Sequence, residues 1–121
     1  MSVHKNQTFR ARLGFALQGL AHGVTTERSL RLQLGSLAAV VVALIILRPG
    51  ALWWALALLA GAGVLAAELL NTAIERLADH LHPEVHPGIR VAKDCAAAGV
   101  LLAALGALAV AVALVVHLLE R

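Results

Sequence analysis

Residues 67–94, AELLNTAIERLADHLHPEVHPGIRVAKD, form the only long polar stretch between two very apolar segments of the chain. Five of the seven acids of the protein lie in it. Residues 67–82 contain no glycine or proline, which predicts a helix. Residues 82–88 contain two prolines and a glycine, which predict a loop. A helix then restarts near residues 89–91, so the predicted fold is centred on two long helices that face each other across a short loop.

Four polar residues of the first predicted helix share one face, at positions i, i+3, i+7 and i+11: Glu68, Asn71, Glu75 and Asp79. Lys93 and Asp94 lie in the first turns of the next predicted helix. Because the two helix ends face each other across the loop, we expect these side chains to gather at one end of the protein.

The composition places the chain in the membrane class. It has 121 residues, which predicts one domain over 1–121, and 60% of them are hydrophobic, with a mean hydropathy of +0.84. Lys and Arg outnumber Asp and Glu by 10 to 7, and no basic patch is interleaved with aromatic residues, so we expect no nucleic-acid partner. The single cysteine, Cys95, excludes an internal disulfide.

Three uncharged runs predict membrane helices. Residues 32–47, 51–67 and 95–116 would be roughly 24, 25 and 33 Å long as helices. The complete helices are expected at about 28–48, 51–82 and 89–118. Trp53 and Trp54 start the second run, where an aromatic belt at the membrane surface is expected.

The segment at about 8–25 predicts an amphipathic helix. Its apolar residues form one helical stripe: Phe9, Leu13, Ala16, Leu17, Leu20 and Val24. Arg10 and Arg12 flank this stripe, as in helices that lie in the membrane surface with arginines near lipid phosphates. The alternative is a helix packed on the protein's own core. Residues 25–27, Thr-Thr-Glu, predict the start of the following helix, with a threonine as its cap.

The distribution of Lys and Arg predicts the orientation. Eight of them, including Lys5, fall at the N-terminus or in the loop after the second membrane helix, and two, Arg48 and Arg121, on the other side. Positively charged loops stay in the cytoplasm, so the N-terminus is predicted to be cytoplasmic and the C-terminus outside. We expect no cleaved signal peptide. The acids and Lys93 would then lie at the membrane face where ATP is available.

The residue types in this cluster suit phosphoryl transfer. An acid near the membrane boundary, such as Glu68, is costly unless it has a partner or a task, and a carboxylate can take the proton of an attacking lipid hydroxyl. Glu75 and Glu27 offer hard oxygen ligands for Mg²⁺, which typically uses one or two carboxylates together with substrate phosphates. Asn71 can hydrogen-bond either acid or the water shell of the metal.

The remaining charges suit a nucleotide. Lys93 can pair with a phosphate as a point charge, and Asp94 can hold Lys93 or bind nucleotide hydroxyls. From the residues alone, a salt-bridge network at the membrane interface remains an alternative for the whole cluster. A small transporter or proton relay using Glu68 and Glu75, or a structural partner in a larger complex, are further alternatives.

Two motifs resemble one family. The sequence ELLNTAIE at 68–75, a loop with His-Pro, and AKD at 92–94 resemble the membrane-integral bacterial diacylglycerol kinases and the similar undecaprenol kinases. Residues 15–31, FALQGLAHGVTTERSLR, resemble the surface helix of that family and its E-R at the first membrane helix. Gln33 departs from the pattern, since some members carry an acid there and others a histidine.

The resemblance implies an all-α fold with an N-terminal surface helix and three membrane helices, assembled as a homotrimer with active sites between subunits in the bacterial inner (cytoplasmic) membrane. It implies Glu68 as the catalytic base and Glu27 and Glu75 as ligands of the metal bound to ATP. It assigns further nucleotide and phosphate contacts to Asn71, Glu84, Val85, His86, Lys93 and Asp94. The family's N-terminal arginine, which contacts substrate, corresponds to Arg10 or Arg12.

The predicted function is therefore that of an ATP-dependent lipid kinase. It would transfer the γ-phosphoryl group of MgATP to diacylglycerol, giving phosphatidate, at the cytoplasmic face of the membrane. Undecaprenol, giving undecaprenyl phosphate, is the alternative lipid.

Overall fold

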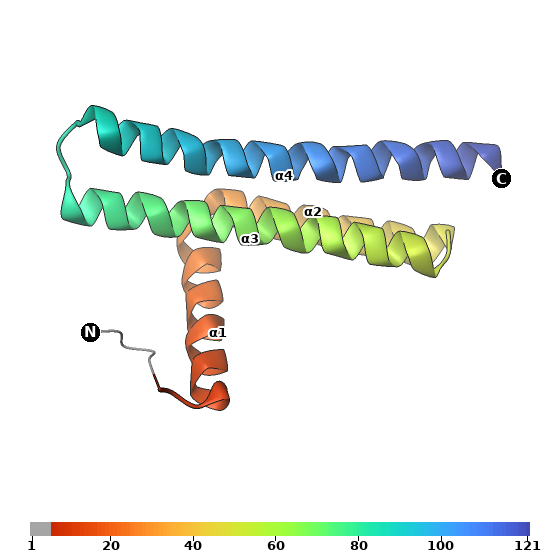
Figure 1. Ribbon diagram of the computed structural model, residues 1–121. Coiled ribbons are helices and arrows are strands. Elements are labelled where there is room, and N and C mark those ends of the chain that lie inside the picture. The colour runs from red at the N-terminus through yellow and green to blue at the C-terminus, as the bar shows by residue number, and fades with distance from the viewer. Residues whose placement is uncertain (1–5) are drawn as a thin grey trace.

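Helices make up almost all of the part of the chain that the structure describes, residues 6–121 of a computed structural model (Figure 1). They are α1 (Phe9–Thr26), α2 (Arg28–Leu47), α3 (Ala51–Leu81) and α4 (Pro87–Glu120). Lys5, which entered the orientation prediction, lies outside the described residues. By length and composition, α2, α3 and α4 are each able to cross a membrane. The predicted all-α fold with three candidate membrane helices is thus confirmed.

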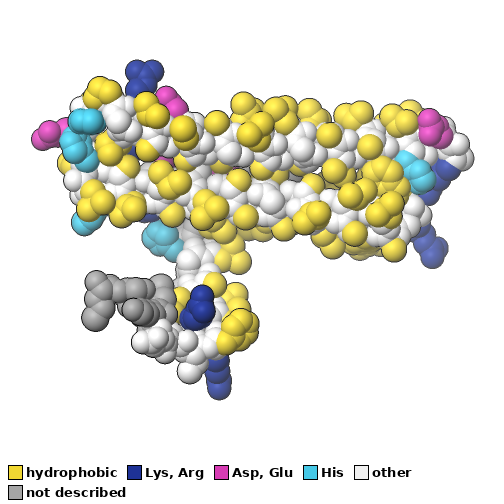
Figure 2. All heavy atoms as spheres, in the orientation of Figure 1, with side chains coloured by type: hydrophobic (Ala, Val, Ile, Leu, Met, Phe, Trp, Pro, Cys, Tyr) yellow, Lys and Arg dark blue, Asp and Glu magenta, His cyan; other side chains and the backbone are white. Residues whose placement is uncertain are grey.

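The three long helices lie side by side, and α3 is in the middle of their packing. Figure 1 shows α2, α3 and α4 running along one axis, with α1 projecting steeply from them. α3 packs against both α2 and α4, whereas within residues 6–121 α4 packs only against α3. The buried apolar side chains among these residues are Leu30, Leu44 and Ala57. Figure 2 shows hydrophobic side chains over the outside of the long helices, with charged and histidine side chains at the two ends, as expected for helices surrounded by lipid.

The different lengths of the helices determine where the polar residues lie. α2 has 20 residues, or roughly 30 Å, which is about the thickness of the hydrocarbon core of a bilayer. α3 has 31 residues and α4 has 34, so both are longer than α2. Because only residues 48–50 join α2 to α3, the surplus lies at the other end, where α3 and α4 extend past the start of α2 and carry the loop 82–86.

The junction of α1 and α2 differs from the sequence prediction. The hydroxyls of Thr25 and Thr26 donate to the carbonyl of His22, at 3.0 and 2.7 Å, within the last turn of α1. They do not cap α2, so the predicted threonine cap is wrong. Glu27 has extended backbone and takes the N-cap position without a capping hydrogen bond.

Arg31 stabilises the same junction from α2. Its guanidinium donates to the carbonyls of Val24 and Thr25, at 2.9 and 3.2 Å. Carbonyl groups in the last turn of a helix lack partners within that helix, and a cationic side chain satisfies them well. This contact fixes the turn from which α1 leaves the bundle.

Gly23 allows α1 to approach the other helices closely. It is buried, and a Cβ atom at this position would lie 2.9 Å from side-chain atoms of both Leu30 and Leu69. We expect Gly23→Val to weaken the docking of α1 and to lower stability by about 1–3 kcal/mol, the usual cost of overpacking. Gly14→Val is the matched control, because nothing lies within 4 Å of a Cβ there. Thermal unfolding in detergent and limited proteolysis near residue 27 measure the effect; equal behaviour of the two variants would contradict it.

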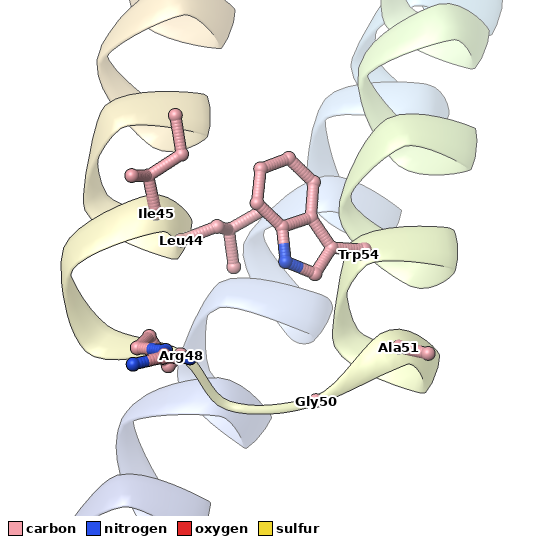
Figure 3. A pocket seen from close by; sticks show the side chains of 6 residues that line it. All are labelled: Leu44, Ile45, Arg48, Gly50, Ala51 and Trp54. Carbon is pink, nitrogen blue, oxygen red and sulfur yellow. The ribbon is translucent and has the colours of Figure 1, made fainter.

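The opposite end of the bundle is closed by a tight turn. Arg48 has left-handed backbone, with φ 52°, and Gly50 has φ 115°, which favours glycine. Arg121 donates to the carbonyls of Leu47 and Arg48, at 2.5 and 3.3 Å, and so ties the end of α4 to the end of α2. A cavity of about 500 Å³ opens here, and Figure 3 shows the Trp54 ring on the α3 side of it, reaching toward α2. No acid lines this cavity, so the candidate chemistry lies at the other end.

Candidate active site

Glu68 on α3 is held by two side chains of α2. Gln33 Nε2 donates to Glu68 Oε1 at 2.8 Å, and Ser29 Oγ donates to Glu68 Oε2 at 3.3 Å. Both donors belong to the first two turns of α2, so Glu68 lies level with the start of that helix. Each carboxylate oxygen keeps free acceptor capacity, because a carboxylate oxygen has two lone-pair sites. The arrangement fixes the orientation of the carboxylate and leaves it able to take a proton.

Gln33, the departure noted in the sequence, makes the shorter of the two contacts with Glu68. Its other side-chain atom, Oε1, is buried and has no hydrogen-bond partner within residues 6–121. Sequence reasoning did not assign Ser29 or Gln33 to the site. Their positions four residues apart at the start of a membrane helix were visible, but the pairing with α3 requires the helix register.

Asn71 and Glu75 form a second polar pair further along α3. Asn71 Nδ2 donates to Glu75 Oε1 at 3.2 Å. The side-chain oxygen of Asn71 is buried without a hydrogen-bond partner in the described part of the chain. Glu75 itself is exposed. This part of α3 therefore holds an exposed carboxylate and a buried amide oxygen without a partner in the described residues, and both are hard oxygen ligands.

Glu27 is paired with an arginine that the sequence did not single out. Arg76 Nη2 on α3 lies 2.8 Å from Glu27 Oε1, and the two side chains are 50% and 30% exposed. A half-exposed ion pair of this kind contributes little stability by itself. It does bring the start of α2 to the part of α3 that carries Glu75.

The loop between α3 and α4 is ordered by its histidines. His86 Nδ1 accepts a hydrogen bond from the Gly88 amide at 3.0 Å and so caps α4, which begins with Pro87. The Nδ1 atom of His82 lies 3.0 Å from the Glu84 carbonyl, and the rings of His82 and His86 meet edge to face, with centroids 5.3 Å apart.

This loop encloses a pocket of about 230 Å³ with the facing ends of α3 and α4. Its lining includes five residues predicted to contact the nucleotide: Glu84, Val85, His86, Lys93 and Asp94. Lys93 Nζ lies 2.6 Å from Asp79 Oδ1, whereas Asp94 makes a longer contact of 3.9 Å with Arg90. Asp79, and not Asp94, therefore holds Lys93, which corrects one of the two roles considered for Asp94.

The structure brings the predicted residues into three neighbouring groups and leaves two residues apart. Glu68, Asn71 and Glu75 share a face of α3, the loop residues line the pocket beyond them, and Glu27 joins through Arg76. Arg10 and Arg12 lie in the first turn of α1, about 22 to 26 Å along that helix from Glu27. Within residues 6–121, no three His, Cys, Asp or Glu side chains converge into a metal cage.

A bundle of apolar helices long enough to cross a membrane, with acids, a lysine and a pocket at one end, is the architecture of a membrane-integral protein. Comparison with known families shows to which family of membrane proteins the chain belongs. Residues 14–115 match the family described as prokaryotic diacylglycerol kinase, and the chain belongs to this family. The resemblance seen in the two motifs is thus confirmed.

Two relatives illustrate the breadth of the family. The diacylglycerol kinase of Synechocystis sp. (strain ATCC 27184 / PCC 6803 / Kazusa) is 36% identical over 97 residues, which cover 79% of this chain and 55% of the relative. The undecaprenol kinase of Bacillus subtilis (strain 168) is 31% identical over 99 residues, which cover 80% of each. The chain therefore spans about half the length of the first relative and most of the second. No solved structure matches the chain.

Proposed function

We propose that the protein is a lipid kinase that transfers the γ-phosphoryl group of ATP to the hydroxyl of a membrane lipid. The observation that carries this proposal is the position of Glu68, level with the start of α2 and held by Ser29 and Gln33. A carboxylate level with the start of a membrane helix can contact a lipid hydroxyl on its membrane side and a nucleotide on its water side. A transporter would instead need its acids near the middle of the membrane.

Glu68 acts as the general base in this proposal. The lipid hydroxyl oxygen attacks the γ-phosphorus, the bond from that phosphorus to the bridging oxygen of ATP breaks, and ADP leaves. The hydroxyl proton passes to Glu68. The hydrogen bonds from Ser29 and Gln33 keep the carboxylate in one orientation, so that the catalytic oxygen need not be positioned during each turnover.

The residues present fit Mg²⁺. Glu75 and the unpartnered side-chain oxygen of Asn71 are hard oxygen ligands, and Mg²⁺ needs only one or two carboxylates when substrate phosphates complete its shell. Glu75 and Asn71 would hold the metal, with Glu27 joining them when released from Arg76. When bound, Mg²⁺ would neutralise charge on the phosphates of ATP.

The pocket at the loop suits the nucleotide. Glu84, Val85 and His86 form one wall, and Lys93 and Asp94 lie opposite on α4. Lys93 would turn from Asp79 to a phosphate oxygen, and Asp94 would accept hydrogen bonds from nucleotide hydroxyls. The nucleotide would then extend along α3 toward Glu75 and Glu68.

We also propose that the protein works as a homotrimer in the bacterial inner membrane, with its N-terminus in the cytoplasm and α1 on the membrane surface. None of the described residues of α4 is buried, and among the described helices it packs only against α3, so most of its surface is available to other subunits. Arg10 and Arg12, far from the acids of their own chain, would contribute to a neighbouring site. A single domain is expected over residues 1–121.

Diacylglycerol, giving phosphatidate, is the proposed lipid, and undecaprenol is the second candidate because the Bacillus subtilis relative bears that name. The test is phosphoryl transfer from labelled ATP in mixed micelles with either lipid. We expect a labelled lipid product that depends on the added lipid and on Mg²⁺, with one lipid used faster than the other. ATP hydrolysis unaffected by lipid, or no transfer to either lipid by a folded chain, would contradict the proposal.

A further inference from the structure

The ion pair of Arg76 and Glu27 joins a residue without an assigned role to a proposed metal ligand. Arg76 Nη2, on α3, lies 2.8 Å from Oε1 of Glu27, the residue directly before α2. Arg76 also directly follows Glu75, the other proposed carboxylate ligand. A guanidinium is thus bonded to one acid of the candidate metal site and adjacent in sequence to the other.

Most of the hydrogen-bonding capacity of Arg76 is free. A guanidinium has five N–H donors in a planar fork, and in the described part of the chain only Nη2 of Arg76 has an acceptor, on Glu27. The side chain is 50% exposed, so the other donors are accessible from water. A planar fork of this kind matches the oxygens of a phosphate group.

Arg76 also borders a cavity of about 320 Å³ between α1 and α3. Most of the cavity lining is small or apolar, and its polar side chains are those of Arg76, Thr72 and His22. No carboxylate lines this cavity. A phosphate group there would meet the guanidinium and the Thr72 hydroxyl, and no like charge in the cavity wall.

We propose that Arg76 is a phosphate-binding residue of the ATP site and that Glu27 holds it until the nucleotide arrives. This inference rests on the proposed kinase function. Without nucleotide, the pair neutralises both charges. When the nucleotide enters with its metal, Glu27 turns to the metal and Arg76 donates to phosphate oxygens, so that each charge exchanges one partner for another and none is left unpaired.

Binding of ATP without metal tests this role separately from catalysis. The full chain in detergent is titrated by calorimetry with ATP, ADP and adenosine in the presence of EDTA. We expect Arg76→Gln to weaken ATP binding by about tenfold, the usual scale for a lost charge-assisted hydrogen bond, and to leave adenosine binding unchanged. Arg76→Lys should retain part of the affinity as a point charge. Arg28→Gln is the matched control, because Arg28 is exposed, adjacent to Glu27 and not bonded to it.

A second pair of variants separates a phosphate contact from a purely structural partner of Glu27. Glu27→Gln should release Arg76 and tighten metal-free ATP binding, and adding Arg76→Gln should remove that gain. If Arg76→Gln binds ATP like the parent in both backgrounds, while the parent phosphorylates lipid, the inference is overturned and the kinase function stands. If the parent neither binds ATP nor phosphorylates lipid, the proposed function fails and this inference fails with it.

Discussion

Replacing Glu68 with glutamine is expected to lower the rate of lipid phosphorylation by at least about 10²-fold, the usual scale for the loss of a general base. Glutamine has nearly the same shape and can still receive the hydrogen bonds of Ser29 or Gln33 on its one oxygen, but it is not a base. The measurement is turnover of labelled ATP at saturating lipid and Mg²⁺. Nucleotide binding should survive, because Glu68 does not line the loop pocket in which the nucleotide is proposed to bind.

Glu120→Gln serves as the control for Glu68→Gln. Glu120 is the last residue of α4, at the opposite end of the bundle from the candidate site, so the substitution removes one carboxylate without touching that site. Its turnover should stay near that of the parent. A Glu68→Gln protein with near-normal turnover and an intact helical spectrum would remove Glu68 from the role of base.

The role of Gln33 as a partner of Glu68 could not be predicted from the sequence. The spacing of Glu68, Asn71 and Glu75 could be read from the sequence because one helix fixes their relative positions. Gln33 belongs to another helix, and its contact with Glu68 depends on the register in which α2 packs on α3. A pattern within one helix carries no information on that register.

The ion pairs show the same limit. Arg76 and Glu27 are 49 residues apart in the chain, and Asp79 and Lys93 are joined across a loop whose shape depends on the His86 cap. Helix positions were predictable because uncharged runs mark the membrane helices, and because Pro83 follows the end of α3. The predicted loop 82–88 was two residues too long at its end, since Pro87 is the first residue of α4. The threonine cap was predicted wrongly because a threonine hydroxyl can also bond back to a carbonyl of the helix that precedes it. Thr25 and Thr26 both bond in this way to the His22 carbonyl of α1, and Glu27 takes the N-cap position of α2.

Replacing Glu75 with glutamine is expected to raise the Mg²⁺ concentration for half-maximal rate by at least about tenfold. Loss of a residue that only orients a metal ligand typically costs 10- to 100-fold in metal affinity, and loss of an anionic ligand itself should cost no less. At saturating Mg²⁺ much of the turnover should return, because the substitution leaves Glu68 and its two donors in place. The measurement is the initial rate of lipid phosphorylation over a Mg²⁺ titration at fixed free ATP.

Asn71→Leu extends the test to the amide whose oxygen has no partner in the described residues. Leucine has a similar volume and no ligand atom, so we expect the Mg²⁺ requirement to rise in the same direction as in Glu75→Gln. Because the amide carries no charge, the rise should be smaller than for the loss of the carboxylate. The Glu120→Gln variant, with an acid removed at the far end of α4, should keep the Mg²⁺ dependence of the parent. If Glu75→Gln and Asn71→Leu also keep it, the metal is held elsewhere, and the polar face of α3 serves only to orient the nucleotide and Glu68.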